Sequence, residues 1–158
     1  MPTAVLESRE YVDCSPQPTI HLRKLQKCVL LIEDSEDAMR LIRLDLRDYG
    51  RRKYRLEWAD CLSEGIRQVL GGGIDIVLLD LGLPESSGFA TYAWLRKAAE
   101  DVPILVLTGD RREETEFAVV ASGIDEYLVK DQISGSMLVE AIEAALSSKK
   151  SWIEHKQP

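Results

Sequence analysis

Hydrophobic residues gather in five short segments that predict β-strands. Residues 54–59 are interrupted by Arg55 and Glu57, so we place this strand at the edge of a sheet, and residues 125–129 predict another short strand. The other three segments are almost continuously apolar, which is typical of strands buried on both faces. These three segments are residues 28–32, 74–79 and 103–107.

Between the strands, apolar residues recur at the three-to-four-residue spacing of amphipathic helices. The predicted helices span residues 37–49, 62–70, 88–99, 112–122 and 133–146. Strands that alternate with helices form βαβ units, and such units build a parallel sheet. The pattern therefore predicts an α/β fold in which a five-stranded parallel sheet carries helices on both faces, with the three most apolar strands at its centre.

The alternating pattern places a single domain at residues 28–146. Residues 1–27 contain three prolines and only short apolar stretches, so we predict an N-terminal extension that is partly disordered or forms a short helix near residues 22–25. Residues 147–158 are predicted to be a C-terminal tail, too short for a DNA-binding or catalytic domain. The sequence leaves open whether the chain is a stand-alone protein or part of a longer one.

Charge and composition narrow the possible functions. The 158 residues carry a net charge of -7, and the ends carry +1 (residues 1–27) and +2 (residues 147–158), so the centre carries -10. An acidic centre argues against a general nucleic-acid binder and favours a cation site or solvated acidic faces. No apolar run approaches the roughly 20 residues that span a bilayer, no signal peptide begins the chain, and three cysteines do not make a disulfide scaffold. We expect a cytoplasmic protein that binds neither nucleic acid nor membrane.

Carboxylate, hydroxyl and amino side chains directly follow four of the predicted strands. The carboxyl ends of parallel strands meet at one sheet edge, where ligands bind, so we expect these side chains to lie close together. They are Glu33, Asp34, Asp80, Thr108 and Lys130. Three neighbouring carboxylates repel one another unless a cation is present, and their oxygens suit Mg²⁺. Together with a hydroxyl and an ammonium, such a cation would stabilise a transferring phosphoryl group, and Asp80 is the candidate nucleophile.

These residues resemble the receiver domain of two-component response regulators. The resemblance covers residues 28–146 and rests on landmarks that occur in family order, each at the end of a predicted strand. They are Glu33-Asp34, residues 78–88 (LLDLGLPESSG), residues 107–109 (LTG) and residues 125–130 (DEYLVK). The resemblance implies a flavodoxin-like, doubly wound (βα)5 fold with strand order 2-1-3-4-5.

The resemblance also implies a role for each landmark. Asp80 would accept a phosphoryl group from a sensor histidine kinase or a histidine phosphotransfer protein. Mg²⁺ would be bound by Asp34, Asp80 and the backbone carbonyl of Gly82, with Glu33 acting mostly through a water. Thr108 and Lys130 would bind phosphoryl oxygens, and Tyr127 would be the switch aromatic that turns inward when Thr108 moves. The only chemistry would be Mg²⁺-dependent self-phosphorylation and autodephosphorylation, and residues 112–146 would form the surface for a downstream protein or a homodimer.

Some positions depart from the family pattern. Glu33 stands where many members have aspartate, and Asp131 follows Lys130 where many have proline and a cis peptide bond, which here would cost roughly 3 kcal/mol more than with proline.

Other functions remain as alternatives. A non-phosphorylated pseudo-receiver would act only as a protein-interaction module, and Tyr127 could simply pack at the sheet edge. A flavodoxin is disfavoured by the acidic residues 33–37, which would repel a phosphate, and a haloacid-dehalogenase-type phosphatase is disfavoured by Gly82, where it would need an aspartate.

Overall fold

A computed structural model describes residues 25–86, 88–109 and 126–156. All five strands pair in parallel, in the order β2-β1-β3-β4-β5. Their bounds are β1 (Lys27–Ile32), β2 (Tyr54–Ala59), β3 (Ile76–Asp80), β4 (Ile104–Thr108) and β5 (Glu126–Val129). The predicted fold class and strand order are thus confirmed, including the edge position of residues 54–59.

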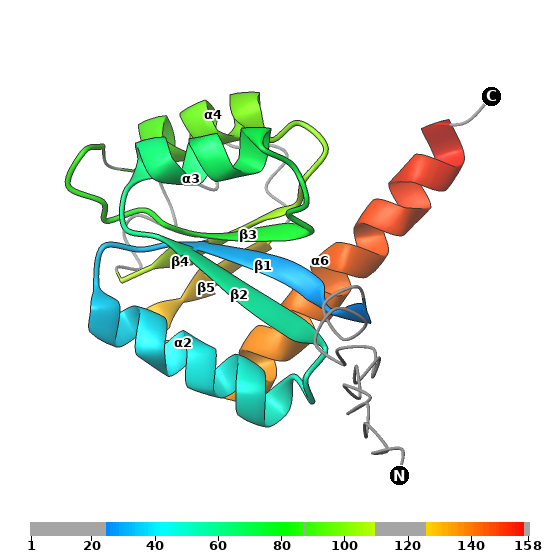
Figure 1. Ribbon diagram of the computed structural model, residues 1–158, viewed down its shortest axis with the longest axis horizontal. Helices are drawn as coiled ribbons and strands as arrows, with labels where there is room; N and C mark the ends of the chain where they lie inside the picture. The colour runs from blue at the N-terminus through cyan, green and yellow to red at the C-terminus, as the bar shows by residue number, and fades with distance from the viewer. Residues whose placement is uncertain (1–24, 87, 110–125, 157–158) are drawn as a thin grey trace, which may run out of the picture.

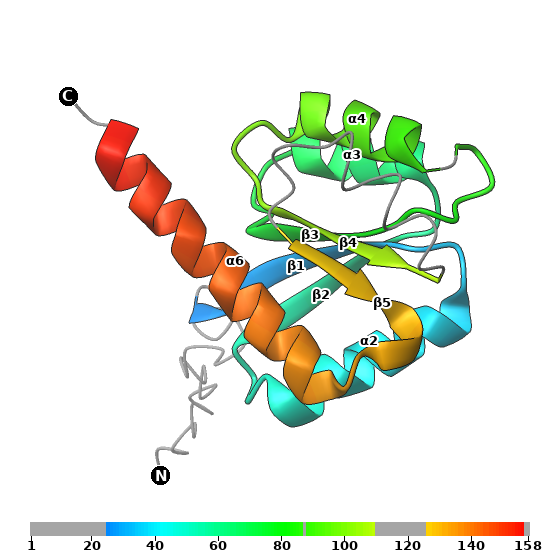
Figure 2. The ribbon, with the colours of Figure 1, turned by 180° about the vertical axis from the view of Figure 1, so that it is seen from behind.

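Helices cover both faces of this sheet. Figures 1 and 2 show α3 and α4 on one face and α2 and α6 on the other. Their bounds are α2 (Glu36–Tyr49), α3 (Leu62–Leu70), α4 (Phe89–Ala98) and α6 (Gly135–Lys156). Within the described ranges, no helix combines the length and the apolar character needed to cross a membrane. The helix predicted at 112–122 lies outside the described residues, as does nearly all of the one near 22–25.

The central strands are buried because each face packs against one helical layer. On β1, Leu30 and Ile32 belong to the core on the α3 and α4 side, whereas Val29 and Leu31 belong to the core on the α2 and α6 side. None of the four side chains is exposed. This two-sided burial explains why the strand is an unbroken apolar run rather than an alternating one.

Helix α3 lies close against β1 because position 65 has no side chain. A Cβ atom on Gly65 would overlap the side chain of Ile32. Ile32 is the last residue of β1 and immediately precedes Glu33. This packing therefore holds the carboxyl end of β1 in place, directly before the predicted site residue Glu33.

The last helix is longer than the sequence pattern predicts. The pattern predicts an end at Leu146, but α6 continues to Lys156 and therefore includes most of the predicted tail. The reason is local: residues 147–156 contain no glycine or proline, and the hydroxyls of Ser147 and Ser148 donate to the carbonyls of Glu143 and Ala144 one turn earlier. The far end of α6 projects away from the sheet (Figure 1). The division of the chain into extension, domain and tail stays a prediction.

Helix α6 begins later than the predicted residue 133 because a separate turn precedes it. Residues Lys130–Gln132 form a short 3-10 helix, η1, and Gly135 starts α6. The described ranges contain no cis peptide bond, so the chain passes from Lys130 to Asp131 in the ordinary trans form.

Candidate functional site

The predicted site residues meet at the carboxyl edge of the sheet. Asp80 is the last residue of β3 and Thr108 the last of β4, while Glu33 and Lys130 directly follow β1 and β5. Glu33, Asp80 and Thr108 are buried, with exposed fractions of 1%, 5% and 0%. Asp34 is exposed. The site is thus a partly buried acidic cluster with one carboxylate open to solvent.

Three carboxylates in this cluster could hold a metal ion. Glu33, Asp34 and Asp80 each offer an oxygen, and these oxygens lie within 4.8 Å of one another. An all-oxygen, carboxylate-rich set with one exposed member fits Mg²⁺, which keeps part of its water shell. The backbone of Gly82 lies beside the cluster, since its N–H donates to Asp80 Oδ1 at 3.1 Å. That its carbonyl completes the metal site stays a prediction.

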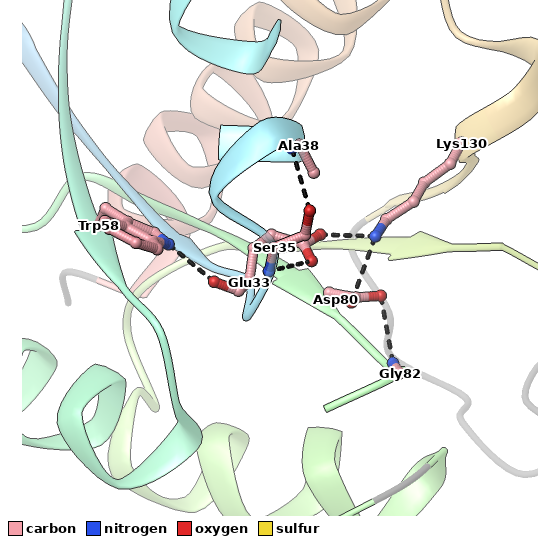
Figure 3. A network of polar contacts seen from close by, with 7 residues as sticks. All are labelled: Glu33, Ser35, Ala38, Trp58, Asp80, Gly82 and Lys130. Carbon is pink, nitrogen blue, oxygen red and sulfur yellow. Dashed lines mark hydrogen bonds and ion pairs between the residues drawn. The ribbon is translucent and has the colours of Figure 1, made fainter. Parts of the chain in front are cut away.

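Lys130 is a cation that pairs with two members of the cluster. Its Nζ lies 2.5 Å from Glu33 Oε2 and 3.2 Å from Asp80 Oδ2, and Figure 3 shows the three side chains pointing toward one another. The Lys130 ammonium thus bridges Asp80, which ends β3, and Glu33, which follows β1. Among the residues that the structure describes, this one ammonium pairs with two of the three carboxylates, which leaves an excess of negative charge in the described part of the site.

Burial and ion pairing act in opposite directions on these groups. Burial raises the pKa of Glu33, against the lowering effect of its hydrogen bonds from Lys130 and the Ser35 amide. Burial alone would lower the pKa of Lys130, but its hydrogen bond to Glu33 and the charge of Asp80 outweigh it and raise that pKa. Lys130 is therefore firmly protonated. A further cation near Glu33 would offset the cost of burying the charge of the Glu33 carboxylate.

Two contacts to Glu33 were not predicted from the sequence. The Trp58 indole N–H donates to the Glu33 backbone carbonyl at 2.7 Å, and the Ser35 N–H donates to Glu33 Oε1 at 3.1 Å (Figure 3). Trp58 lies on β2, 25 residues from Glu33, and no spacing rule links the two positions. Together these bonds fix both the backbone and the side chain of the first acidic residue.

Thr108 and Tyr127 lie on the same side of the sheet. Tyr127 pairs with Val106 and Val129 pairs with Thr108, so Tyr127 lies two residues below the level of Thr108 on the adjacent strand. Tyr127 is partly buried, and it packs against the core under α3 and α4. The two residues thus occupy neighbouring strands, as a switch pair would require.

Comparison with known proteins decides the family. The family model described as "Response regulator receiver domain" matches residues 29–143. The chain belongs to this receiver domain family. The assignment confirms the resemblance that the strand-end landmarks indicated.

Relatives of this receiver domain include longer regulatory proteins. The cell cycle transcriptional regulator CtrA of Caulobacter vibrioides is 35% identical over 102 residues, and the KDP operon transcriptional regulatory protein KdpE of Escherichia coli is 32% identical over 102 residues. Each alignment covers 65% of this chain but only 43% of CtrA and 44% of KdpE. The chain thus spans less than half the length of these relatives.

Solved receiver domains share the fold. A response regulator receiver domain protein from Clostridium thermocellum superimposes with a TM-score of 0.68 at 25% identity, covering 80% of this chain and 98% of that one. The signal receiver domain of an HD domain-containing protein from Pseudomonas fluorescens gives a TM-score of 0.71 at 21% identity, covering 82% of this chain and 93% of that one.

Proposed function

We propose that this receiver domain accepts a phosphoryl group on Asp80 from a sensor histidine kinase or a histidine phosphotransfer protein. The observation that carries the proposal is the convergence on Asp80: Lys130 Nζ lies 3.2 Å from its Oδ2, and two further carboxylates lie beside it. An isolated acid at a strand end would have neither an ammonium nor a potential metal site next to it.

The proposed reaction is a displacement at phosphorus. A carboxylate oxygen of Asp80 forms the new P–O bond while the P–N bond of a phosphohistidine breaks, and the electron pair leaves with the imidazole nitrogen, which takes up a proton from water. Lys130 would turn toward a phosphoryl oxygen, and the Thr108 hydroxyl would donate to another. Asp34, Asp80 and the Gly82 carbonyl would hold Mg²⁺, with Glu33 acting mostly through a water, and the ion would supply positive charge to the phosphoryl oxygens. The chemistry acts on the protein's own Asp80. In autodephosphorylation a water oxygen would attack the phosphorus, the P–O bond to Asp80 would break, and inorganic phosphate would leave as the Asp80 carboxylate is restored.

Intact mass spectrometry tests the acceptor. The chain is incubated with Mg²⁺ and a small-molecule phosphodonor, and we expect the wild type to gain one phosphoryl group. Asp80→Asn should gain none. The matched control is Asp60→Asn, because Asp60 is an exposed acid that follows β2 at the same sheet edge, and this variant should label like the wild type. Equal labelling of Asp80→Asn would remove Asp80 as acceptor, and an unlabelled wild type would favour the pseudo-receiver.

The proposed output of phosphorylation is a change of surface. A phosphoryl group adds charge and acceptor oxygens, which would draw Thr108 inward and let Tyr127 follow it. The surface formed by residues 112–146, of which 112–125 lie outside the described residues, would then bind a downstream protein or a second copy. Backbone amide NMR with a beryllofluoride mimic should shift resonances of residues 108–131. Shifts confined to the loops after Asp34 and Asp80 would contradict the switch but not the acceptor.

A further inference from the structure

Helix α3 begins without a cap of its own. Its N-cap residue is Cys61, in extended conformation, and the Cys61 side chain forms no capping hydrogen bond. The first N–H groups of a helix have no partner within the helix, and serine, threonine, aspartate or asparagine usually supplies one. Here Glu85 supplies it from 23 residues away, since the Leu62 N–H donates to Glu85 Oε1 at 3.0 Å. A carboxylate at this position also interacts favourably with the helix dipole.

Glu85 lies on the loop that leaves the phospho-acceptor. This loop, residues 81–88, joins β3 to α4 and starts directly after Asp80. Its base is closed by the Gly88 N–H, which donates to the Leu81 carbonyl at 3.3 Å, and by the Gly82 N–H, which donates to Asp80 Oδ1. Glu85 is exposed, so its carboxylate does not need this contact to avoid a buried, unpaired charge. The bond instead ties the outer part of the loop to α3.

We infer that Glu85 is a positioning residue that holds the Gly82 loop against α3 and so couples the acidic site to the first turn of that helix. The inference rests on the proposed function, because the proposed function is what gives this loop a role in binding Mg²⁺ and the phosphoryl group. Gly82 is three residues from Glu85 and bonds directly to Asp80. Coupling between two sites is reciprocal, so a cation that orders the loop should also protect the Leu62 amide.

A purely structural cap would behave differently. If Glu85 only capped α3, its loss would expose the Leu62 amide and lower stability without affecting the loop that carries Gly82. If Glu85 positions the loop, its loss must also change the Gly82 amide and the affinity for Mg²⁺. The Gly82 amide therefore separates the two roles, and it does so in the apo protein.

Amide hydrogen exchange and Mg²⁺ titration on the full chain test this inference. In Glu85→Ala we expect faster exchange at both Leu62 and Gly82, by about fivefold, since a helix cap typically contributes about 1 kcal/mol. We also expect the dissociation constant for Mg²⁺ to rise severalfold. Glu85→Gln keeps an oxygen acceptor, so its amide exchange rates at Leu62 and Gly82 should stay near those of the wild type. Glu100→Ala replaces an exposed glutamate beyond α4 and is the control for the loss of one negative charge.

Each outcome decides the inference. Faster exchange at Leu62 alone, with Gly82 and Mg²⁺ affinity as in Glu100→Ala, reduces Glu85 to a cap and overturns the coupling. Unchanged exchange at Leu62 overturns it as well. If the wild type binds no Mg²⁺ and accepts no phosphoryl group, the proposed function fails, and the Gly82 amide of the apo variants still decides whether Glu85 positions the loop.

Discussion

Removing Lys130 should destabilise the protein far more than removing an ordinary surface lysine. In Lys130→Met, Glu33 and Asp80 lose the ammonium that lies 2.5 Å and 3.2 Å from their oxygens, and both carboxylates are almost completely buried. Breaking a buried ion pair from one side costs about 3–5 kcal/mol. Because 31% of the Lys130 side chain is exposed and water screens the pair, we expect about 2–3 kcal/mol.

A second lysine offers a matched control. Lys53 pairs with Glu143 at 3.1 Å, but their side chains are 59% and 47% exposed, so Lys53→Met should cost about 0.5 kcal/mol. In thermal unfolding followed by circular dichroism with a chelator present, Lys130→Met should melt about 5–10 °C below the wild type. Mg²⁺ at about 100 times its dissociation constant stabilises by about 2.7 kcal/mol, so it should recover most of this loss.

The effect of Lys130→Met should also depend on pH. Burial already raises the pKa of Glu33, and without the lowering hydrogen bond from Lys130 that pKa should rise further. A carboxyl whose folded-state pKa is raised stabilises fully below its unfolded value, near 4.5, and loses this contribution as pH rises through the folded value. The difference in free energy of unfolding between the wild type and Lys130→Met should therefore become smaller toward pH 4 and larger toward neutral pH. Equal melting of the Lys130 and Lys53 variants at pH 7 would refute the reasoning.

Three further predictions concern the surroundings of the site. Gly65→Ala should overpack α3 against β1 and destabilise the protein by about 1–3 kcal/mol, measured by urea unfolding, and a neutral effect would show that the helix can move away. The fluorescence of Trp58 should change when Mg²⁺ binds, because its indole bonds the carbonyl of Glu33, and the change should vanish in Asp34→Ala; a signal that persists there has another origin. Burial, and then the charge of Glu143, raise the pKa of Tyr54 to about 12, so the stability that this residue contributes should fall between pH 10 and 12. Tyr54→Phe should not show this fall. Ultraviolet titration of the tyrosinate should give the same high pKa for Tyr54, and an ordinary value near 10 would contradict the prediction.

The sheet and the acidic site could be predicted from the sequence because both leave periodic or positional signals. A strand buried on both faces is an apolar run, and the residue after it lies at the sheet edge, so Glu33, Asp80 and Lys130 could be brought together from their positions alone. The pairing of Lys130 with Glu33, as well as with Asp80, depends on the longer glutamate side chain and on packing.

The contacts that hold the site in place could not be predicted. Trp58 reaches the Glu33 carbonyl across 25 residues, and Glu85 caps α3 across 23, and both bonds follow from three-dimensional packing rather than from any repeat. The length of α6 was missed for a different reason. After Leu146 the apolar spacing weakens, which suggests a helix end, but residues 147–156 contain no glycine or proline that would stop a helix already formed.

The long α6 gives the domain a lever. At 1.5 Å per residue, its 22 residues make a rod about 33 Å long, which packs on α2 and the sheet as far as Leu146 and projects beyond them at its end (Figure 2). If the anchored part tilts by about 10°, simple geometry moves the tip of such a rod by about 6 Å. A tilt that shifts the packed half of the helix by no more than about 3 Å would thus become a displacement as large as a whole helical turn at the far end of α6.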